Sequence, residues 1–578
     1  MKKIERYARI AAHIAIQKSP LPVQALFKHT EEHQRRKMSR LYAHSKPEDG
    51  SKGTLLFWVP GGMPLLLHVE GAIAAAMKLR GYKVHAIICN APYRGCSIRT
   101  VDDGVAVADW RSVCASCTKQ TKSVLDTLGV PYSYNGDYVT DEQRDELWER
   151  TANVTLDNLK DLKYEGLDLG SNVRSTIIRY LQGAALEGNE AIIREHAYSA
   201  LVSAAASIKV MDTIRPWRVF MSHGVYVDWG PAMHAAMARN IPVTGWKASY
   251  LSWHFYLRHV TDVDRIDFKL LSEKAWLDMR SRKLTPIQNA RLDKFFEDRY
   301  KKQISFDMKK IKEFRHDVDE LRAEYGRPGR PLWAVLAHIN WDSVSDYSPM
   351  AYPSFDEWMI DTVRTAIDIP EVDWLIKVHP IEAWDNPASG VQRLLEREFP
   401  HLPPHIRVIP AEEDVSPANL FEIIDGGVTV YGTAGLELAL IGKPVILAGE
   451  AHYGGKGFTH EGLTPPAYRD LLKKAVTLGP LDAGQREAVR QYAYSHFIRR
   501  QIPLEIVHHG DSVWWSLQHE KRDLLLPGND PFIDFICDKL VSGEDFIMDE
   551  RLVALTEREV TGGGGVAEAI AVAEVSAA

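Results

Sequence analysis

Two segments of the chain carry residue types that can hold and release an anion. The first is KVHPIE at 377–382, where a cation and a histidine stand at the expected end of a buried strand. The second is GTAGLE at 432–437, which follows the apolar run Val428–Tyr431 and is expected to open a helix. Free N–H groups at a helix start attract phosphate. The two segments together predict a phosphate site that needs no metal.

Each residue of these segments has an expected role. Thr433 can cap the helix and offer its hydroxyl to a phosphate, and Gly435 lets a ligand approach the backbone. Glu437 can accept hydrogen bonds from ribose hydroxyls, and Tyr453 lies in a glycine-rich loop that can cover a sugar or base. The alternative is an ordinary capped helix with a solvated Glu437 and an irregular surface loop. The expected binding residues are Asn340, Lys377, His379, Glu382, Thr433, Gly435, Glu437 and Tyr453.

These segments need strands to position them, and strand–helix alternation occurs twice along the chain. Such alternation is typical of parallel α/β sheets, which bind ligands at the carboxyl ends of their strands. The expected strands are Thr54–Val59, Lys83–Ile88, Trp217–Ser222, Ile241–Trp246, Leu332–Ala337, Trp374–Val378, Ile406–Ile409, Val428–Tyr431 and Pro444–Ala448. A chain of 578 residues is too long for one core, so two large domains are expected.

The predicted organisation has six parts. They are an N-terminal helical extension (1–50), an N-terminal Rossmann-like domain with a helical insertion (51–265), a helical bridge (266–330), a C-terminal Rossmann-like domain (331–482), C-terminal helices (483–548) and a disordered tail (549–578). The first helix has a basic, amphipathic pattern. It is expected to pack on its own domain, with attachment to an anionic membrane surface as the alternative.

Composition narrows the class of protein. The formal net charge is −7, which provides no general attraction to nucleic acid, so an anionic ligand must be held by local groups. No long uncharged apolar run predicts a transmembrane helix, and the N-terminus has no secretory signature. We therefore expect a cytoplasmic protein with no nucleic-acid partner.

The second half of the chain resembles the capsule polysaccharide biosynthesis family of glycosyltransferases, which is related to bacterial Kdo transferases. The matching segments are K-x-H-P-x-E (377–382), GTAGLE with GKPV (432–445) and YGGKGFT (453–459). The resemblance implies a GT-B fold, in which two Rossmann-like domains face a cleft. It implies a CMP-, UDP- or GDP-linked sugar donor on the C-terminal domain and no catalytic metal. It also implies a glycan or glycolipid acceptor, with peripheral attachment at the inner membrane beside polysaccharide assembly proteins.

The same resemblance implies how the reaction is catalysed. His379 and Thr433 would hold the departing phosphate, because a leaving group that gains negative charge needs donors in a water-poor site. An inverting transferase also needs a base that takes the proton of the acceptor hydroxyl. His223 and Asp228, after a predicted strand of the first domain, are the candidates, with ordinary loop residues as the alternative. Asp102 and Asp103 are the second choice.

Four of the five cysteines lie within 29 residues and form a separate candidate site. They are Cys89, Cys96, Cys114 and Cys117. Four thiolates can close a tetrahedral zinc site, and a cytoplasmic compartment argues against disulfides. An iron–sulfur cluster and unliganded or redox thiols are the alternatives. A metal at this place would be structural.

Two other functions fit the same sequence. A nucleotide-sugar 2-epimerase shares the GT-B fold and needs no acceptor. A non-catalytic scaffold of a polysaccharide assembly complex would keep the fold without turnover. Sugar transfer from a nucleotide-sugar is the leading hypothesis.

Overall fold

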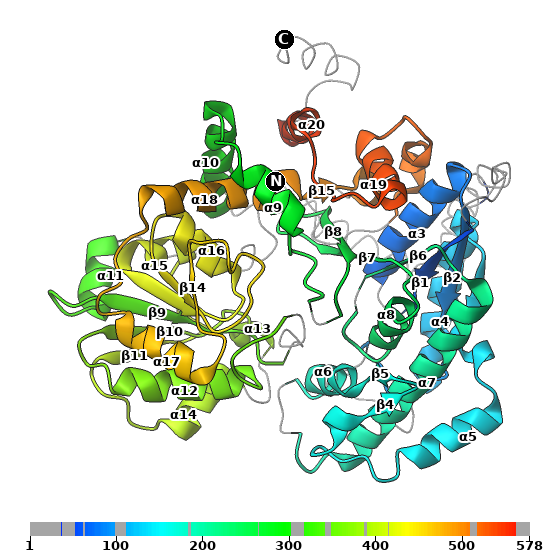
Figure 1. Ribbon diagram of the computed structural model, residues 1–578, viewed down its shortest axis with the longest axis horizontal. Helices are drawn as coiled ribbons and strands as arrows, with labels where there is room; N and C mark the ends of the chain where they lie inside the picture. The colour runs from blue at the N-terminus through cyan, green and yellow to red at the C-terminus, as the bar shows by residue number, and fades with distance from the viewer. Residues whose placement is uncertain are drawn as a thin grey trace, which may run out of the picture.

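The computed structural model describes most of the chain between residues 53 and 561. The described residues are 36, 53–61, 64–98, 111–182, 186–222, 224–263, 265–301, 317–341, 348–385, 390–413, 415–508 and 517–561. Within these ranges the chain forms two α/β domains, with the N-terminal domain at the right of Figure 1 and the C-terminal domain at the left. His223, Asp102, Asp103, the expected first helix and the last 17 residues lie outside the described residues.

The N-terminal domain is built on a seven-stranded sheet with the order β15-β8-β7-β6-β1-β2-β3. Five neighbouring strands are parallel: β1 (Thr54–Trp58), β2 (Lys83–Ile88), β3 (Tyr132–Tyr134), β6 (Arg218–Met221) and β7 (Val243–Ala248). The chain adds β2 and β3 on one side of β1 and then returns to add β6 and β7 on the other side. This is the strand order of a Rossmann-like sheet.

Both faces of the N-terminal sheet are buried, which explains why its strands are apolar without alternation. Leu56 and Trp58 pack with α7 (Glu190–Ile214) and α8 (Gly230–Met237) on one face. Leu55 and Phe57 pack with α3 (Pro64–Leu79) on the other. Successive strand residues point to opposite faces, so a single short strand anchors both cores.

The C-terminal domain has a six-stranded, fully parallel sheet with the order β11-β10-β9-β12-β13-β14. Its strands are β9 (Leu332–Leu336), β10 (Asp373–Lys377), β11 (Ile406–Ile409), β12 (Gly426–Thr429), β13 (Val445–Leu447) and β14 (His460–Glu461). The order again reverses direction beside the first strand, between β9 and β12. In open α/β sheets, ligands bind at this reversal, outside the carboxyl ends of the strands.

Three helices connect the two sheets: α9 (Glu273–Arg280), α10 (Pro286–Lys301) and α11 (Val318–Tyr325). After the second sheet, α18 (Ala483–Tyr494) packs against α9 and α10. The chain then crosses back, because β15 (Ile502–Pro503) pairs antiparallel with β8 (His254–Val260) of the first sheet. Helix α19 (Pro531–Ser542) follows and contacts α3, as Figure 1 shows at the upper right.

The sequence predicts a disordered tail over 549–578, but its first part is helical. Helix α20 spans Glu550–Thr561. It forms because Leu552 and Val553 are buried in the apolar cluster beside α19. The hydroxyl of Tyr494 also donates a hydrogen bond to Glu550 at 2.9 Å. These contacts explain the difference from the expected tail.

The expected fold class is confirmed: both domains are doubly wound α/β units with helical extensions. All nine expected strands are present, each shifted by no more than two residues at an end. Strands β3, β4 (Lys163–Tyr164), β5 (Leu167–Asp168), β8, β14 and β15 were not expected. Among the described residues, no helix combines the length and apolar character needed to cross a membrane.

Candidate functional site

The reversal of strand order in the C-terminal sheet holds a buried histidine that the sequence did not single out. His338 follows β9, is 9% exposed and stacks on Phe355 with ring centroids 4.6 Å apart. Its Nε2 accepts from the backbone N–H groups of Val430 and Tyr431, each at 3.2 Å. The histidine therefore fixes the backbone that leads from β12 toward the helix start at 433.

Lys377 and His379 lie at the end of the neighbouring strand, β10. The Lys377 side chain donates to the carbonyl of Pro410 at 3.0 Å, so this cation braces the adjacent β11 loop. His379 is half-buried, and its Nδ1 accepts from the N–H of Ile381 at 3.2 Å. Burial lowers the pKa of His338, and the charge of His379 adds to this effect. The two histidines both follow neighbouring parallel strands, β9 and β10, at the carboxyl edge of the sheet.

Helix α16 (Thr433–Leu440) begins at the same edge. A Cβ at Gly432, the residue that precedes the helix, would lie 3.7 Å from the ring of His338. The sequence expectation that KVHPIE and GTAGLE converge on one sheet edge is therefore met, with His338 between them. The hydroxyl of Thr433 contacts the hydroxyl of Tyr250 in the N-terminal domain. The helix start thus faces the other domain.

The hydroxyl of Tyr453 occupies the space beside Gly435 where a side chain would otherwise lie, at the start of α16. Tyr453 is fully buried, and its hydroxyl donates to the carbonyl of Gly432 at 2.6 Å. A Cβ at Gly435 would lie 2.1 Å from that hydroxyl. The glycine is therefore required by Tyr453, and Tyr453 supports the helix from within the domain rather than covering a ligand.

Glu437 is held by two residues of α10. Its carboxylate pairs with Arg299 at 3.1 Å, and both side chains are 5% exposed. The hydroxyl of Tyr300 donates to the other carboxylate oxygen. The sequence suggested a contact of Glu437 with ribose hydroxyls, but in the structure the carboxylate anchors α16 to the connecting helices.

Glu382 and Asn340 also have protein partners. The Glu382 carboxylate accepts from the N–H of Val391 at 2.9 Å and so caps α14 (Val391–Glu398). Burial raises the pKa of this carboxyl group. The Asn340 amide donates to Asp356 at 2.7 Å. Asn340 lies in the loop after β9, and Glu382 is the first residue of the short helix α13 (Glu382–Asp385), so both hold segments at the carboxyl edge of the sheet.

The N-terminal domain contributes cations to the same region. Arg265 forms an ion pair with Glu450, just beyond β13, at 2.5 Å. Lys269 pairs with Asp267 at 3.9 Å, and its charge adds, after burial and the charge of His379, to the lowered pKa of His338. We call the region formed by His338, His379, Thr433, Tyr250 and Lys269 the interdomain seam. Because a buried anion needs nearby donors and cations, the seam has the groups that a phosphate requires.

Asp228 lies in the N-terminal domain, between β6 and α8. It is 2% exposed and accepts from the Ser97 hydroxyl at 2.9 Å, while its backbone carbonyl accepts from the Trp58 indole at 2.8 Å. Its second carboxylate oxygen has no hydrogen-bond partner among the described residues. Burial raises the pKa of Asp228 to about 7. A carboxyl group of this kind can exchange a proton near neutral pH.

The four clustered cysteines surround a small cavity that Asp228 also lines. The cavity has a volume of about 40 Å³. All five cysteines are free thiols, and burial raises the pKa values of Cys89 and Cys96. In the described part of the chain, no three His, Cys, Asp or Glu side chains are grouped so that they could hold a metal ion. The zinc hypothesis therefore gains no support from the geometry.

Three residues of the seam were missed by sequence reasoning: His338, Tyr250 and Lys269. His338 has a detectable signal, since it directly follows the expected strand Leu332–Ala337. Tyr250 and Lys269 have none, because their significance comes from contacts with the other domain.

Buried neutral histidines make the protein sensitive to acid. Burial lowers the pKa values of His196 and His254 to about 4, and that of His338 to about 3. In the unfolded chain these groups titrate near 6.5, so the unfolded state binds more protons below that pH. We expect the free energy of unfolding to be unaffected by these groups above pH 6.5. It should fall below that pH by up to about 1.4 kcal/mol per pH unit for each histidine.

Urea unfolding between pH 7.5 and 5 measures this slope. His196→Gln should reduce the slope, because it removes one titrating group, whereas His401→Gln at an exposed position should not. A free energy of unfolding that stays constant or rises between pH 6.5 and 5 would contradict the assignment.

A comparison with known protein families matches the part of the chain that contains KVHPIE, GTAGLE and YGGKGFT. Residues 344–475 match a family model. The family is described as capsule polysaccharide biosynthesis protein. The match includes KVHPIE, GTAGLE and YGGKGFT, so the resemblance inferred from these segments is confirmed for this part of the chain. No match to a curated protein was found.

Three solved structures illustrate how remote the structural likeness is. A KpsC β-Kdo 2,4 transferase of Thermosulfurimonas dismutans is 15% identical, with 54% of this chain and 87% of that chain covered and a TM-score of 0.33. The KpsC β-Kdo 2,7 transferase of the same organism is 13% identical, covering 49% and 79%, with a TM-score of 0.28. A UDP-GlcNAc 2-epimerase from Neisseria meningitidis is 11% identical, covering 76% and 96%, with a TM-score of 0.23. Likeness at this level carries no argument about activity.

Proposed function

We propose that this protein is a glycosyltransferase that moves a sugar from a nucleotide-sugar to a saccharide acceptor of a surface polysaccharide. The observation that carries the proposal is the convergence of His379, His338 and the start of α16 at the strand-order reversal of the C-terminal sheet. This edge lies within the region that matches the capsule polysaccharide biosynthesis family. The donor would bind here and the acceptor on the N-terminal domain.

The chemistry follows from where negative charge develops. When the bond between sugar and phosphate breaks, the departing phosphate gains charge and needs donors that are already oriented. The N–H groups at the start of α16 and the ring of His379 supply donors, and Lys269 of the other domain supplies positive charge. Tyr250 contacts Thr433 at this place. The contact supports a binding mode in which the N-terminal domain would lie over the phosphate end of the donor.

Nucleotide binding tests the proposal. A ligand that binds only the folded state raises the unfolding temperature, so at least one of CMP, UDP and GDP is expected to stabilise the full chain. His379→Ala should lower the affinity for that nucleotide roughly 10- to 100-fold, because a hydrogen bond to a charged group contributes about 1.5–3 kcal/mol. His401→Ala, at an exposed position in the same domain, is the matched control.

Two results would argue against this assignment. One is that none of the three nucleotides stabilises the protein, and the other is that His379→Ala binds as the native chain does. Incubation of the donor sugar without any acceptor separates the remaining alternatives. Conversion of the sugar under that condition would indicate an epimerase, whereas a transferase should release nucleotide only when an acceptor is added.

A further inference from the structure

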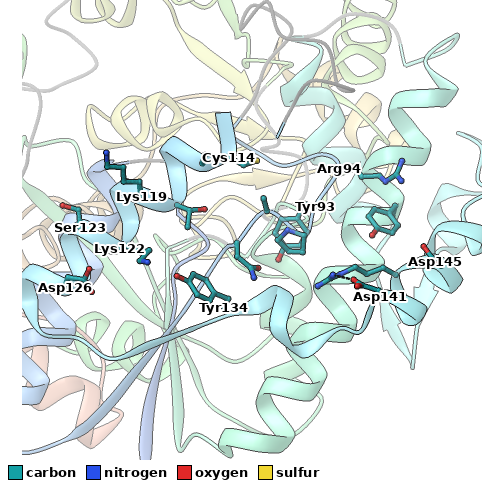
Figure 2. A pocket seen from close by; sticks show the side chains of 17 residues that line it. Tyr93, Arg94, Cys114, Lys119, Lys122, Ser123, Asp126, Tyr134, Asp141 and Asp145 are labelled. Carbon is teal, nitrogen blue, oxygen red and sulfur yellow. Dashed lines mark hydrogen bonds and ion pairs between the residues drawn. The ribbon is translucent and has the colours of Figure 1, made fainter. Parts of the chain in front are cut away.

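The N-terminal domain contains a large cavity that does not include the seam residues. It lies at the carboxyl ends of β2 and β3, between α4 (Arg111–Leu128) and α5 (Asp141–Arg150), and has a volume of about 1030 Å³. Figure 2 shows its lining side chains. We call it the α4 cavity. Its volume is at the upper end of the range that small-molecule sites occupy.

One face of α4 supplies a polar wall of this cavity. Thr118, Lys119, Lys122, Ser123 and Asp126 all line it, at the three- and four-residue spacing that places side chains on one side of a helix. The opposite side of α4 is apolar and packs on α3, where Leu128 lies against Gly71. The helix is therefore amphipathic, and its polar side lines the cavity.

Two lysines, Lys119 and Lys122, lie on this wall. Among the described residues, neither Lys119 nor Lys122 makes a hydrogen bond or an ion pair. Because they are three residues apart, they lie on one face of the helix, and their positive charges act on the same part of the cavity. Arg144, on the other side of the cavity, differs because it is paired with Asp141 at 2.6 Å. The two lysines thus add positive charge to the lining of the cavity.

The rest of the lining suits a ligand rich in hydroxyl groups. The Arg94 guanidinium lies 3.9 Å from the centre of the Trp148 ring and pairs with Glu195 at 3.6 Å, so it is held at the cavity edge. Tyr134 presents a half-buried aromatic ring. Asp126 and Asp145 are exposed carboxylates that accept hydrogen bonds from hydroxyls but repel phosphates. This mixture of cations, acceptors and aromatic surface is unsuited to a nucleic acid, which presents phosphates throughout.

We infer that the α4 cavity binds an acidic saccharide, as a segment of the acceptor chain some sugars away from the reacting end. Its sugar carboxylates would lie against Lys119 and Lys122, its hydroxyls against the two aspartates, and a ring face against Tyr134. The inference rests on the proposed sugar transfer for its biological meaning, because a transferase that extends a charged polysaccharide must hold the growing chain. The binding itself can be measured without any transfer.

Calorimetric titration of the full chain with tetragalacturonate, with neutral maltotetraose as the comparison, tests the inference. We expect tetragalacturonate to bind, and K119Q/K122Q to weaken its binding at least tenfold. Raising the NaCl concentration from 50 to 500 mM should weaken the binding of tetragalacturonate, because salt screens exposed charges. K160Q/K209Q removes the same charge from exposed positions of the same domain outside the cavity, and should bind as the native chain does.

Binding of CMP, UDP or GDP should be equal in all three proteins, so failure of the saccharide site and failure of the donor site give different results. The inference is overturned if tetragalacturonate does not bind the native chain. It is also overturned if K119Q/K122Q binds it normally, if K160Q/K209Q loses as much affinity, or if maltotetraose binds equally well.

Discussion

Arg299→Met is expected to lower the free energy of unfolding by about 3–5 kcal/mol, because removing one partner of a buried ion pair leaves the other charge uncompensated. Arg299 and Glu437 are both almost fully buried, and the hydroxyl of Tyr300 would remain beside the carboxylate. The loss should grow as the pH rises above about 4.5, where Glu437 ionises in the unfolded chain. Urea unfolding at pH 5 and pH 8 measures both effects.

The double variant R299M/E437Q is the control that isolates the charge. A neutral glutamine needs no cation, so the double variant should recover a large part of the stability that Arg299→Met loses. If the double variant is no more stable than Arg299→Met alone, the loss comes from packing and not from an unpaired carboxylate. A loss below about 1 kcal/mol in the single variant would mean that water reaches Glu437.

Arg299→Met should also affect the candidate donor site. Glu437 lies one turn after Thr433 in α16, and its ion pair joins this helix to α10. Loosening that link lets the helix start shift relative to His338 and Tyr250. The buried pair thus connects the stability of the C-terminal domain with the geometry of the phosphate site, a role that the sequence does not indicate for Glu437.

The fold could be predicted because the signal for each main strand lies within a short stretch of sequence. Buried parallel strands are short apolar runs bounded by turns, and Lys83–Ile88 and Ile406–Ile409 have the expected bounds. Strands β14 and β15 were not predicted because each has only two residues, too few to show a pattern of apolar residues. Strand β15 also depends on a long return of the chain to the first sheet, which no local signal specifies.

The candidate site could be predicted only in outline. The convergence of KVHPIE and GTAGLE follows from the rule that carboxyl ends of parallel strands share one edge. The partners of individual side chains do not follow from it. Glu437 pairs with Arg299 of α10, and α18 packs against both α10 and α16. Tyr453 is buried because the glycine-rich loop folds beneath Gly435. Such contacts are tertiary, and residue spacing alone does not encode them.

With Asp228 as the general base of the proposed sugar transfer, Asp228→Asn is expected to lower the rate by about 10²- to 10⁴-fold, the usual contribution of such a base. The candidate role requires a carboxylate that is ionised during turnover, and burial sets the pKa of Asp228 to about 7. A base acts when deprotonated, so the rate in the native protein should rise with pH through about 7. The asparagine keeps the acceptor for the Ser97 hydroxyl, so the fold should be retained.

The pH profile separates catalysis from structure. A residue that only supports the fold would lower the rate equally at all pH values, whereas loss of the base should also remove the rise near pH 7. Nucleotide binding should be unchanged, since the described partners of Asp228, Ser97 and Trp58, belong to the N-terminal domain. Asp157→Asn, at an exposed position of that domain, is the matched control. If Asp228→Asn keeps more than about a tenth of the rate, then by the magnitude expected of a base the proton is taken by another group.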